Sequence, residues 1–284
     1  MVRTHHPDSL KEALSIRGME KVTVLAGGTD LMVRNRSWSG TLPVFERDVL
    51  FIGHLEELKK IREKGEFIIL GASCTLAQIM HDGRVPEYVK LPLAQMASSA
   101  IRNVATIGGN ICNASPAGDT LPMLYALNAS LQLNSEQGSR IVTIQDFITG
   151  PGGTGLQDDE ILTEIHIPTA CFSHQYYKKA GLRKANAISK VSFFAVANSN
   201  HNRIDEVRIA LGAVAPTPVR SREGEALLAG LEIEALPERF YDVKACYEQL
   251  LSPIDDVRST EKYRHKAALL ILEDFLLNVL RSHA

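Results

Sequence analysis

Compact apolar runs alternate with amphipathic stretches along the first part of the chain. Val22–Ala26 (VTVLA) and Asp48–Gly53 (DVLFIG) are short and rich in β-branched or large apolar residues, so both predict buried strands. Between them, Thr29 or Asp30 can cap a short helix. Together these patterns predict a small β-α-β-like unit.

A helix is predicted ahead of this unit. The apolar side chains of the stretch 10–14 recur at helical spacing. Ser9 and Glu12 stand at the spacing of a capping box, so we expect the helix to begin at Asp8 or Ser9. Gly18 is the expected end of the helix, because glycine commonly terminates helices.

The middle of the chain mixes strand and helix patterns. The same criteria predict strands at Glu66–Ala72, Ser130–Leu133, Arg140–Thr143 and Ile161–Ile167, and helices at 76–79, Pro92–Ser98 and Leu121–Leu127. Thr75 is the expected cap of the first of these helices. Pro168 is expected to end the last strand, and Gly150–Gly155 (GPGGTG) is predicted to be a flexible loop between strands.

The pattern changes after Pro168. We expect strands at Val191–Ala197 and Val207–Ala213, an extended connector at Ala215–Arg220, and helices at Glu238–Leu251 and Thr260–Arg281. The most hydrophobic run, 267–280, is interrupted by two acidic residues and is too short to span a bilayer, so it predicts a buried helix. We place a domain boundary near residue 170. The first domain covers 1–170, with subdomains of about 1–55 and 56–170, and the second covers 171–284.

Composition narrows the possible functions. The chain has 284 residues, which favours more than one domain, and a net charge of −2, which gives no electrostatic reason to expect nucleic acid or anionic lipid as a partner. The four cysteines (Cys74, Cys112, Cys171 and Cys246) are scattered without a CxxC motif. That spacing disfavours a disulfide framework or an internal metal cluster and favours a cytoplasmic protein. The histidines at 5, 6, 54 and 81 follow no metal-ligand spacing.

Two glycine pairs are the most unusual local feature. Ala26–Asp30 (AGGTD) and Ala105–Asn110 (ATIGGN) both place Gly-Gly after an apolar stretch. Backbone N–H groups without a neighbouring Cβ can approach a phosphate closely, so two such loops could hold a diphosphate. Neither loop matches G-x-G-x-x-G or the P-loop pattern, which disfavours a Rossmann or P-loop site. Each pair could equally serve a turn or close backbone packing.

Several longer segments, in this order, resemble the FAD-binding (medium) subunits of molybdenum hydroxylases, the family of xanthine and carbon monoxide dehydrogenases. They are Ala26–Leu31, Ile101–Pro122, Asp158–Pro168, Tyr177–Ser189, Gly212–Arg220 and Ile254–Ala267. The resemblance implies an α+β protein. Its first domain would be a vanillyl-alcohol-oxidase or PCMH-type FAD-binding domain of two α/β subdomains. Its C-terminal α+β domain would carry a small antiparallel sheet and helices.

The resemblance also implies a set of FAD-binding residues. They are Ala26, Gly27, Gly28, Thr29, Asp30 and Leu31 on the first loop; Thr106, Gly108, Gly109 and Asn110 on the second; and Ser115, Asp119, Ile161, Leu162 and Lys179 elsewhere. Asp119 would bind adenosine-side hydroxyls, and Lys179 would lie near the isoalloxazine ring. Without the resemblance, Asp119 reads as a helix N-cap and Lys179 as a solvated surface lysine.

The implied function is electron transfer, with no catalytic residue supplied by this chain and no metal bound by it. Electrons would reach noncovalent FAD from a small subunit with two 2Fe–2S clusters and pass to NAD⁺ or another acceptor. A large subunit would hold the molybdopterin, in a heterotrimer without a membrane span. Thr29 stands where some related flavoproteins carry a histidine that attaches FAD, which supports noncovalent binding. Asn186 and Ala187 stand where many relatives have acidic residues, so the resemblance does not predict which molecule accepts electrons from the flavin.

The sequence also suggests a substrate class for the complex and leaves two alternative functions for the chain. Residues 101–113 and Ala215–Arg220 lean towards the purine-oxidising, xanthine dehydrogenase-like branch. A stand-alone FAD reductase of the same fold, similar to MurB, is the first alternative, although we identify no serine and glutamate that would act as its acids. A structural subunit that has lost its flavin is the second alternative, and the intact glycine pairs disfavour it.

Overall fold

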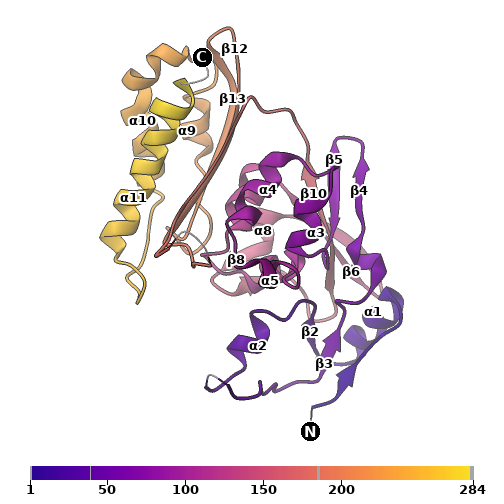
Figure 1. Cartoon of the computed structure of the whole chain (residues 1–284). Helices are drawn as coiled ribbons and strands as arrows, with labels where there is room; N and C mark the ends of the chain where they lie inside the picture. Colours follow the sequence, from indigo (N-terminus) through magenta and orange to yellow (C-terminus); the bar gives the residue numbers. More distant parts are fainter. Residues whose placement is uncertain (1, 39, 184–185, 282–284) are drawn as a thin grey trace. The chain divides into compact units, whose positions relative to one another are not determined.

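A computed structural model describes residues 2–38, 40–183 and 186–281. The chain divides into two compact units (Figure 1). The first unit comprises Met1–Val85, Ala97–Ala114 and Ala129–Pro168, and the second comprises Pro86–Met96, Ser115–Asn128 and Thr169–Ala284. The chain therefore passes between the units several times, and the segment that resembles the second FAD loop contributes to both.

The first unit begins with a three-stranded parallel sheet of order β1-β3-β2, made of Thr4–His5, Val49–Phe51 and Thr23–Leu25. Helix α2 (Leu31–Arg34) connects β2 to β3, so the predicted β-α-β arrangement is confirmed. The hydrophobic core behind this sheet contains Ala13, Leu14, Val22, Leu50, Ile52, Leu55, Leu58 and Ile161. Strand β1 was not predicted, because two residues are too few to show an alternating pattern.

Helix α1 (Leu10–Met19) is capped as expected but ends later. The Ser9 hydroxyl accepts a hydrogen bond from the Glu12 N–H, and the Glu12 carboxylate accepts one from the N–H of Asp8 rather than of Ser9. The prediction that Gly18 ends the helix was wrong. Gly18 lies within the last turn, Met19 is the last helical residue, and Glu20 is the C-cap with an extended backbone.

A five-stranded antiparallel sheet forms the larger part of the first unit. Its order is β4-β5-β10-β6-β7, and its strands are Ile61–Lys64, Phe67–Gly71, Ile161–Pro168, Ser130–Ser135 and Gly138–Thr143. The accompanying helices are η1 (Glu56–Lys59), α3 (Leu76–His81), α5 (Ser99–Arg102), α6 (Ile107–Asn113) and α8 (Ile144–Phe147). The predicted strands are thus confirmed, and β4 joins them at one edge of the sheet.

Several boundaries differ from prediction. The end of β10 is confirmed, because Pro168 is its last residue and pairs with Phe67, but the next boundaries were predicted wrongly. The supposed flexible loop Gly150–Gly155 contributes to a hairpin of β8 (Ile148–Gly150) and β9 (Gly153–Thr154). The prediction of a helix at Pro92–Ser98 was wrong, because Pro92 lies near the end of α4 (Glu87–Ala94) rather than at a helix start.

The second unit is built on an antiparallel sheet of three consecutive strands, β11 (His174–Ala180), β12 (Val191–Asn200) and β13 (Arg203–Gly212). Its helices are α4, α7 (Thr120–Ala126), α9 (Arg222–Ala226), η2 (Ile233–Ala235), α10 (Leu236–Glu248) and α11 (Glu261–Asp274), followed by a π turn at Phe275–Val279. Helices α10 and α11 cover one face of β12 and β13 (Figure 1).

Strand β12 is buried on both faces. Val191, Phe193 and Ala195 pack in the core shared with α10 and α11, while Ser192 faces the α7 side, where Pro122 also lies near Gly212. Burial on both sides explains why this strand shows a continuous apolar run rather than strict alternation. Within the described ranges, no helix is both long enough and apolar enough to cross a bilayer.

Candidate cofactor-binding site

The first glycine loop lies between β2 and α2 and has no room for side chains. A Cβ on Gly27 would stand 2.1 Å from the carbonyl oxygen of Val104 and 3.1 Å from the Cα of Ala105. Gly28 has a φ of +69°, a conformation that residues with a Cβ rarely adopt. The first loop is therefore packed directly against the chain that enters the second loop.

The backbone donors of the first loop are unused. Among the residues that the structure describes, the N–H groups of Gly27, Gly28, Thr29 and Asp30 donate to no protein acceptor. Four consecutive free N–H groups at the start of a helical turn form a concentrated donor set. A phosphate or diphosphate is the kind of ligand such a set binds.

The second loop uses its two glycines differently. A Cβ on Gly108 would stand 2.7 Å from both the Cβ and the carbonyl oxygen of Ala72, so this glycine permits close packing against the end of β5. Gly109 is exposed, and its added Cβ would meet only the Thr106 hydroxyl, at 2.8 Å. Gly108 therefore serves the fold, and Gly109 leaves an open backbone surface.

The N–H groups of the second loop, unlike those of the first, are engaged within the protein. Ile107 and Gly108 donate to the carbonyls of Cys74 and Ala72 at 3.1 and 2.9 Å. Gly109 donates to the Thr106 hydroxyl oxygen at 3.1 Å, which makes Thr106 the N-cap of α6. This bond leaves the hydroxyl proton of Thr106 as a donor for a ligand.

Side chains also connect the two loops. Asn113, at the end of α6, donates to the Asp30 carboxylate at 3.0 Å. Arg34, at the end of α2, donates to the Asn113 side-chain oxygen at 2.5 Å. The Asp30 side chain thus links the first loop to α6, the helix whose first turn contains Gly108 and Gly109 of the second loop. Asn113 and Arg34 were not predicted, because no local pattern indicates a bond between residues so far apart in sequence.

In the second unit, Asp119 and Lys179 form a buried ion pair. The Lys179 ammonium lies 2.6 Å from Asp119 Oδ2, and both side chains are 7% exposed. Asp119 Oδ1 accepts hydrogen bonds from Tyr177 at 3.0 Å and Ser189 at 2.5 Å. Burial and then the Asp119 charge raise the pKa of Tyr177 well above its usual value, so Tyr177 stays protonated and donates.

This geometry shows that the surface reading of Lys179 was wrong, whereas Asp119 does stand at the N-cap position of α7. Lys179 is not a solvated surface lysine, since its ammonium is buried and also donates to the Gln95 carbonyl at 3.3 Å. Asp119 precedes α7, but its side chain makes no capping hydrogen bond. It also limits the expected binding of adenosine hydroxyls, because both Asp119 oxygens already accept bonds from protein side chains.

Three other residues predicted to bind FAD, Ser115, Ile161 and Leu162, make contacts that stabilise the fold. The Ser115 hydroxyl accepts from the Ala117 N–H at 3.3 Å, which forms a local turn. Ile161 and Leu162 are buried on β10, Ile161 within the N-terminal core. Tyr177 and Ser189 donate hydrogen bonds to Asp119. They are the first and last residues of Tyr177–Ser189, one of the segments that resemble the family, but no sequence spacing predicts that they bind Asp119. Lys184 and Ala185 of that segment lie outside the described residues.

One cluster of side chains that could bind a metal ion is already neutralised by an arginine. Ligand atoms of His5, Glu20 and Asp48 lie within 4.8 Å of one another. The Arg3 guanidinium already pairs with Glu20 at 3.0 Å and with Asp48 at 2.7 Å. Arg3 therefore supplies the positive charge that a metal ion would otherwise bring.

Comparisons with known proteins show which family the chain belongs to. Residues 1–170 match a family model described as the FAD binding domain in molybdopterin dehydrogenase. Residues 175–279 match a second, described as the CO dehydrogenase flavoprotein C-terminal domain.

Individual relatives cover nearly the whole chain. The chain is 30% identical to the xanthine dehydrogenase FAD-binding subunit of Escherichia coli O157:H7 over 92% of this chain and 89% of that subunit. It is also 30% identical to the glyceraldehyde dehydrogenase medium chain of Sulfolobus acidocaldarius, over 93% of each. A structure of reconstituted CO dehydrogenase from Oligotropha carboxidovorans aligns with a TM-score of 0.90 and 25% identity, covering 100% of this chain and 99% of that one. The chain therefore belongs to the family of FAD-binding medium subunits of molybdenum hydroxylases.

Proposed function

We propose that this chain carries FAD and transfers electrons within a molybdenum hydroxylase complex. It accepts electrons from the 2Fe–2S clusters of a small subunit and passes them to NAD⁺ or another acceptor. The observation that supports this most is the first glycine loop, whose four consecutive N–H donors have no protein partner among the described residues. Bound FAD supplies the redox chemistry, because its ring takes up electrons singly or in pairs.

The residues of the first unit fit the pyrophosphate of FAD. The N–H groups of Gly27–Asp30 offer donors to one side of the diphosphate, where no Cβ obstructs close approach. Thr106 offers its hydroxyl proton, and the bare backbone of Gly109 offers an open surface beside it. The FAD is held noncovalently, since Thr29 offers no attachment chemistry equivalent to a histidine.

The Lys179–Asp119 pair acts at one end of the cofactor. In an extended FAD, the adenosine and the isoalloxazine lie on opposite sides of the pyrophosphate, so two paired side chains cannot serve both ends. We assign the pair to the flavin ring. Beside the ring, the Lys179 ammonium would favour negative charge on the flavin and so raise its reduction potential, and the paired Asp119 carboxylate would moderate this effect.

The partners follow from the relatives. Their names describe medium chains or FAD-binding subunits, which implies larger and smaller companions. We propose a heterotrimer with molybdopterin on the large subunit and purines as the preferred substrates. The scattered cysteines support a cytoplasmic location. A domain boundary near residue 170 is supported by Thr169, at which the last segment of the second unit begins.

The assembled complex offers the direct test of electron transfer. Adding a purine such as xanthine under anaerobic conditions should bleach the visible band of the flavin, and adding NAD⁺ should restore it. The isolated chain with FAD should show neither change, since the substrate and cluster sites lie elsewhere. Turnover of a substrate by the isolated chain would instead favour a stand-alone, MurB-like reductase. A complex that is active without flavin would favour a structural subunit.

A further inference from the structure

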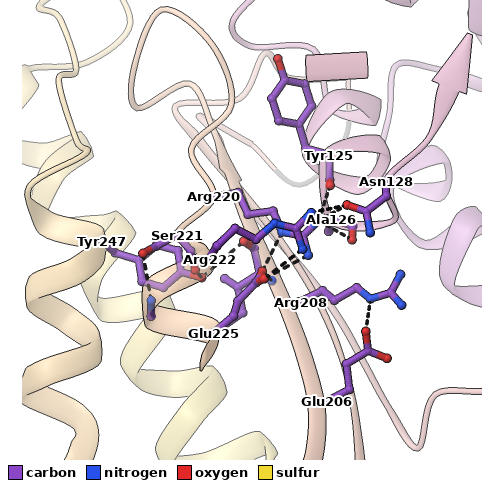
Figure 2. A network of polar contacts seen from close by, with 12 residues as sticks. Tyr125, Ala126, Asn128, Glu206, Arg208, Arg220, Ser221, Arg222, Glu225 and Tyr247 are labelled. Atoms are coloured by element: carbon purple, nitrogen blue, oxygen red, sulfur yellow. Dashed lines mark hydrogen bonds and ion pairs between the residues drawn. The ribbon is translucent and has the colours of Figure 1, made fainter. Parts of the chain in front are cut away.

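A buried ion pair in the second unit lies away from the predicted FAD residues. The Arg220 guanidinium donates to the Glu225 carboxylate through two nitrogens, at 2.7 and 3.0 Å (Figure 2). The two side chains are only 5% and 8% exposed. Glu225 also accepts from the Ile209 N–H of β13 at 2.8 Å. Arg220 is therefore held in a fixed orientation from one side.

The other side of Arg220 reaches the end of helix α7. Its NH1 donates to the carbonyls of Tyr125 and Ala126 at 2.5 and 2.7 Å and to the Asn128 side chain at 2.9 Å (Figure 2). The last carbonyls of a helix have no partners within the helix, and a cation at this end also suits the helix dipole. Arg220 thus anchors the C-terminal end of α7 to β13 and α9.

Helix α7 connects this anchor to the Lys179–Asp119 pair. Asp119 is the residue immediately before α7, and Tyr125 and Ala126 lie in its last turn. Every residue from Thr120 to Ala126 is buried, and Pro122 lies so close to Gly212 that a Cβ there would stand 2.8 Å away. Close packing along the whole of a short, buried helix transmits a displacement of one end to the other, so the anchored last turn contributes to the position of Asp119.

We propose that Arg220, with Glu225, is a positioning residue for Lys179. It acts through α7 and Asp119, and the position of the ammonium in turn tunes the bound flavin. This inference rests on the proposed function, in which Lys179 acts at the flavin ring. It assigns a redox-tuning role to a pair that contacts no predicted FAD residue directly.

The test compares two neighbouring arginines in the full chain loaded with FAD. Arg220→Lys keeps the charge but cannot make the two-nitrogen contact with Glu225 and reach both carbonyls. Arg222→Ala is the control, because Arg222 also bonds Asn128 and Glu225 but is 62% exposed and has no bond to the α7 carbonyls. We expect Arg220→Lys to shift the flavin absorption spectrum and lower its reduction potential, whereas Arg222→Ala leaves both unchanged.

A double-mutant cycle with Lys179→Met makes the test specific. Lys179→Met should lower the potential by removing the cation, and adding Arg220→Lys to it should change nothing further. Additive shifts would overturn the proposal, because Arg220 would then act by another route. A folded Arg220→Lys variant with the spectrum and potential of the wild type would also overturn it.

Folding and cofactor loading are checked separately. Circular dichroism and thermal melting show whether each variant folds, and if Arg220→Lys does not, Glu225→Gln gives the second test, with a smaller shift in the same direction. Glu225→Gln without any shift would then overturn the proposal. If the wild type takes up no FAD even in its complex, the proposed function itself fails. If the wild type binds FAD and Lys179→Met leaves potential and spectrum unchanged, only the inference and the assignment of Lys179 fail.

Discussion

At the scale of single residues, the two glycines within each Gly-Gly pair have different structural roles. Gly27 and Gly108 permit backbone packing, because an added Cβ would overlap Val104 and Ala72. Gly28 supplies a left-handed backbone conformation, and Gly109 leaves an open surface. The sequence shows where the pairs are, but not which glycine serves the fold and which serves a ligand. That distinction depends on neighbours distant in sequence.

This division predicts that substitutions of Gly27 and Gly109 differ in their cost in stability, although both reduce FAD binding. Gly27→Ala should destabilise the fold by about 1–3 kcal/mol, as overpacking typically does, and should also abolish FAD binding. Gly109→Ala should cost less stability, since its Cβ meets only the Thr106 hydroxyl, yet should weaken FAD binding. Urea unfolding and FAD titration measure the two quantities. Equal effects of the two variants on both quantities would contradict this division.

At the scale of elements, prediction succeeded where an apolar run marks the strand and failed where no such run is present. The strands β5, β6, β10, β12 and β13 follow apolar runs and were predicted. The strands β1, β8 and β9 have two or three residues and lack the apolar run that identifies the equally short β2 and β3. Strand β11 (HQYYKKA) is largely polar, and it forms because β12 pairs with it along its whole length. Such pairing is a tertiary effect that a local pattern cannot show.

One ionic contact should make the stability of the second unit depend on pH. Arg264, at the start of α11, pairs with Asp256 at 2.8 Å and donates to the Lys190 and Ala213 carbonyls. Burial alone would raise the pKa of Asp256, but the N–H of Arg258 and the Arg264 guanidinium outweigh it and lower the pKa to about 2. Since this is below the value of about 3.9 in unfolded chains, the stabilisation is complete above about pH 4 and is lost as pH falls towards 2.

Asp256→Asn should therefore reduce stability at neutral pH and flatten the acid side of the stability profile. Asp255→Asn is the matched control, because Asp255 is exposed and its carboxylate accepts from the Glu261 N–H. Chemical unfolding between pH 2 and pH 7, the range set by the reference and shifted values, gives the profiles. An unchanged acid slope in Asp256→Asn would show that the Arg264 contact contributes nothing.

At the scale of the whole molecule, the residues predicted to bind FAD are divided in sequence between the two compact units. The sequence places Ile101–Pro122 as one continuous motif, yet its first part belongs to the first unit and Ser115–Pro122 to the second. The glycine loops could be predicted from local chemistry. The partners of Asp119, by contrast, come from residues 58 to 70 positions away, and the resemblance pointed only to Lys179 among them. Composition and spacing cannot predict such long-range pairing.

The central claim is that the first glycine loop binds the pyrophosphate of FAD. Titration of the purified chain with FAD, followed by flavin absorbance and fluorescence, tests it most directly, and the same titration in the assembled complex covers a site that the partners complete. We predict one FAD per chain, released by heat as unmodified FAD, with competition by ADP, which shares the diphosphate. Absence of FAD uptake by both the chain and the complex, or uptake unaffected in a folded Gly28→Val variant, would contradict the claim.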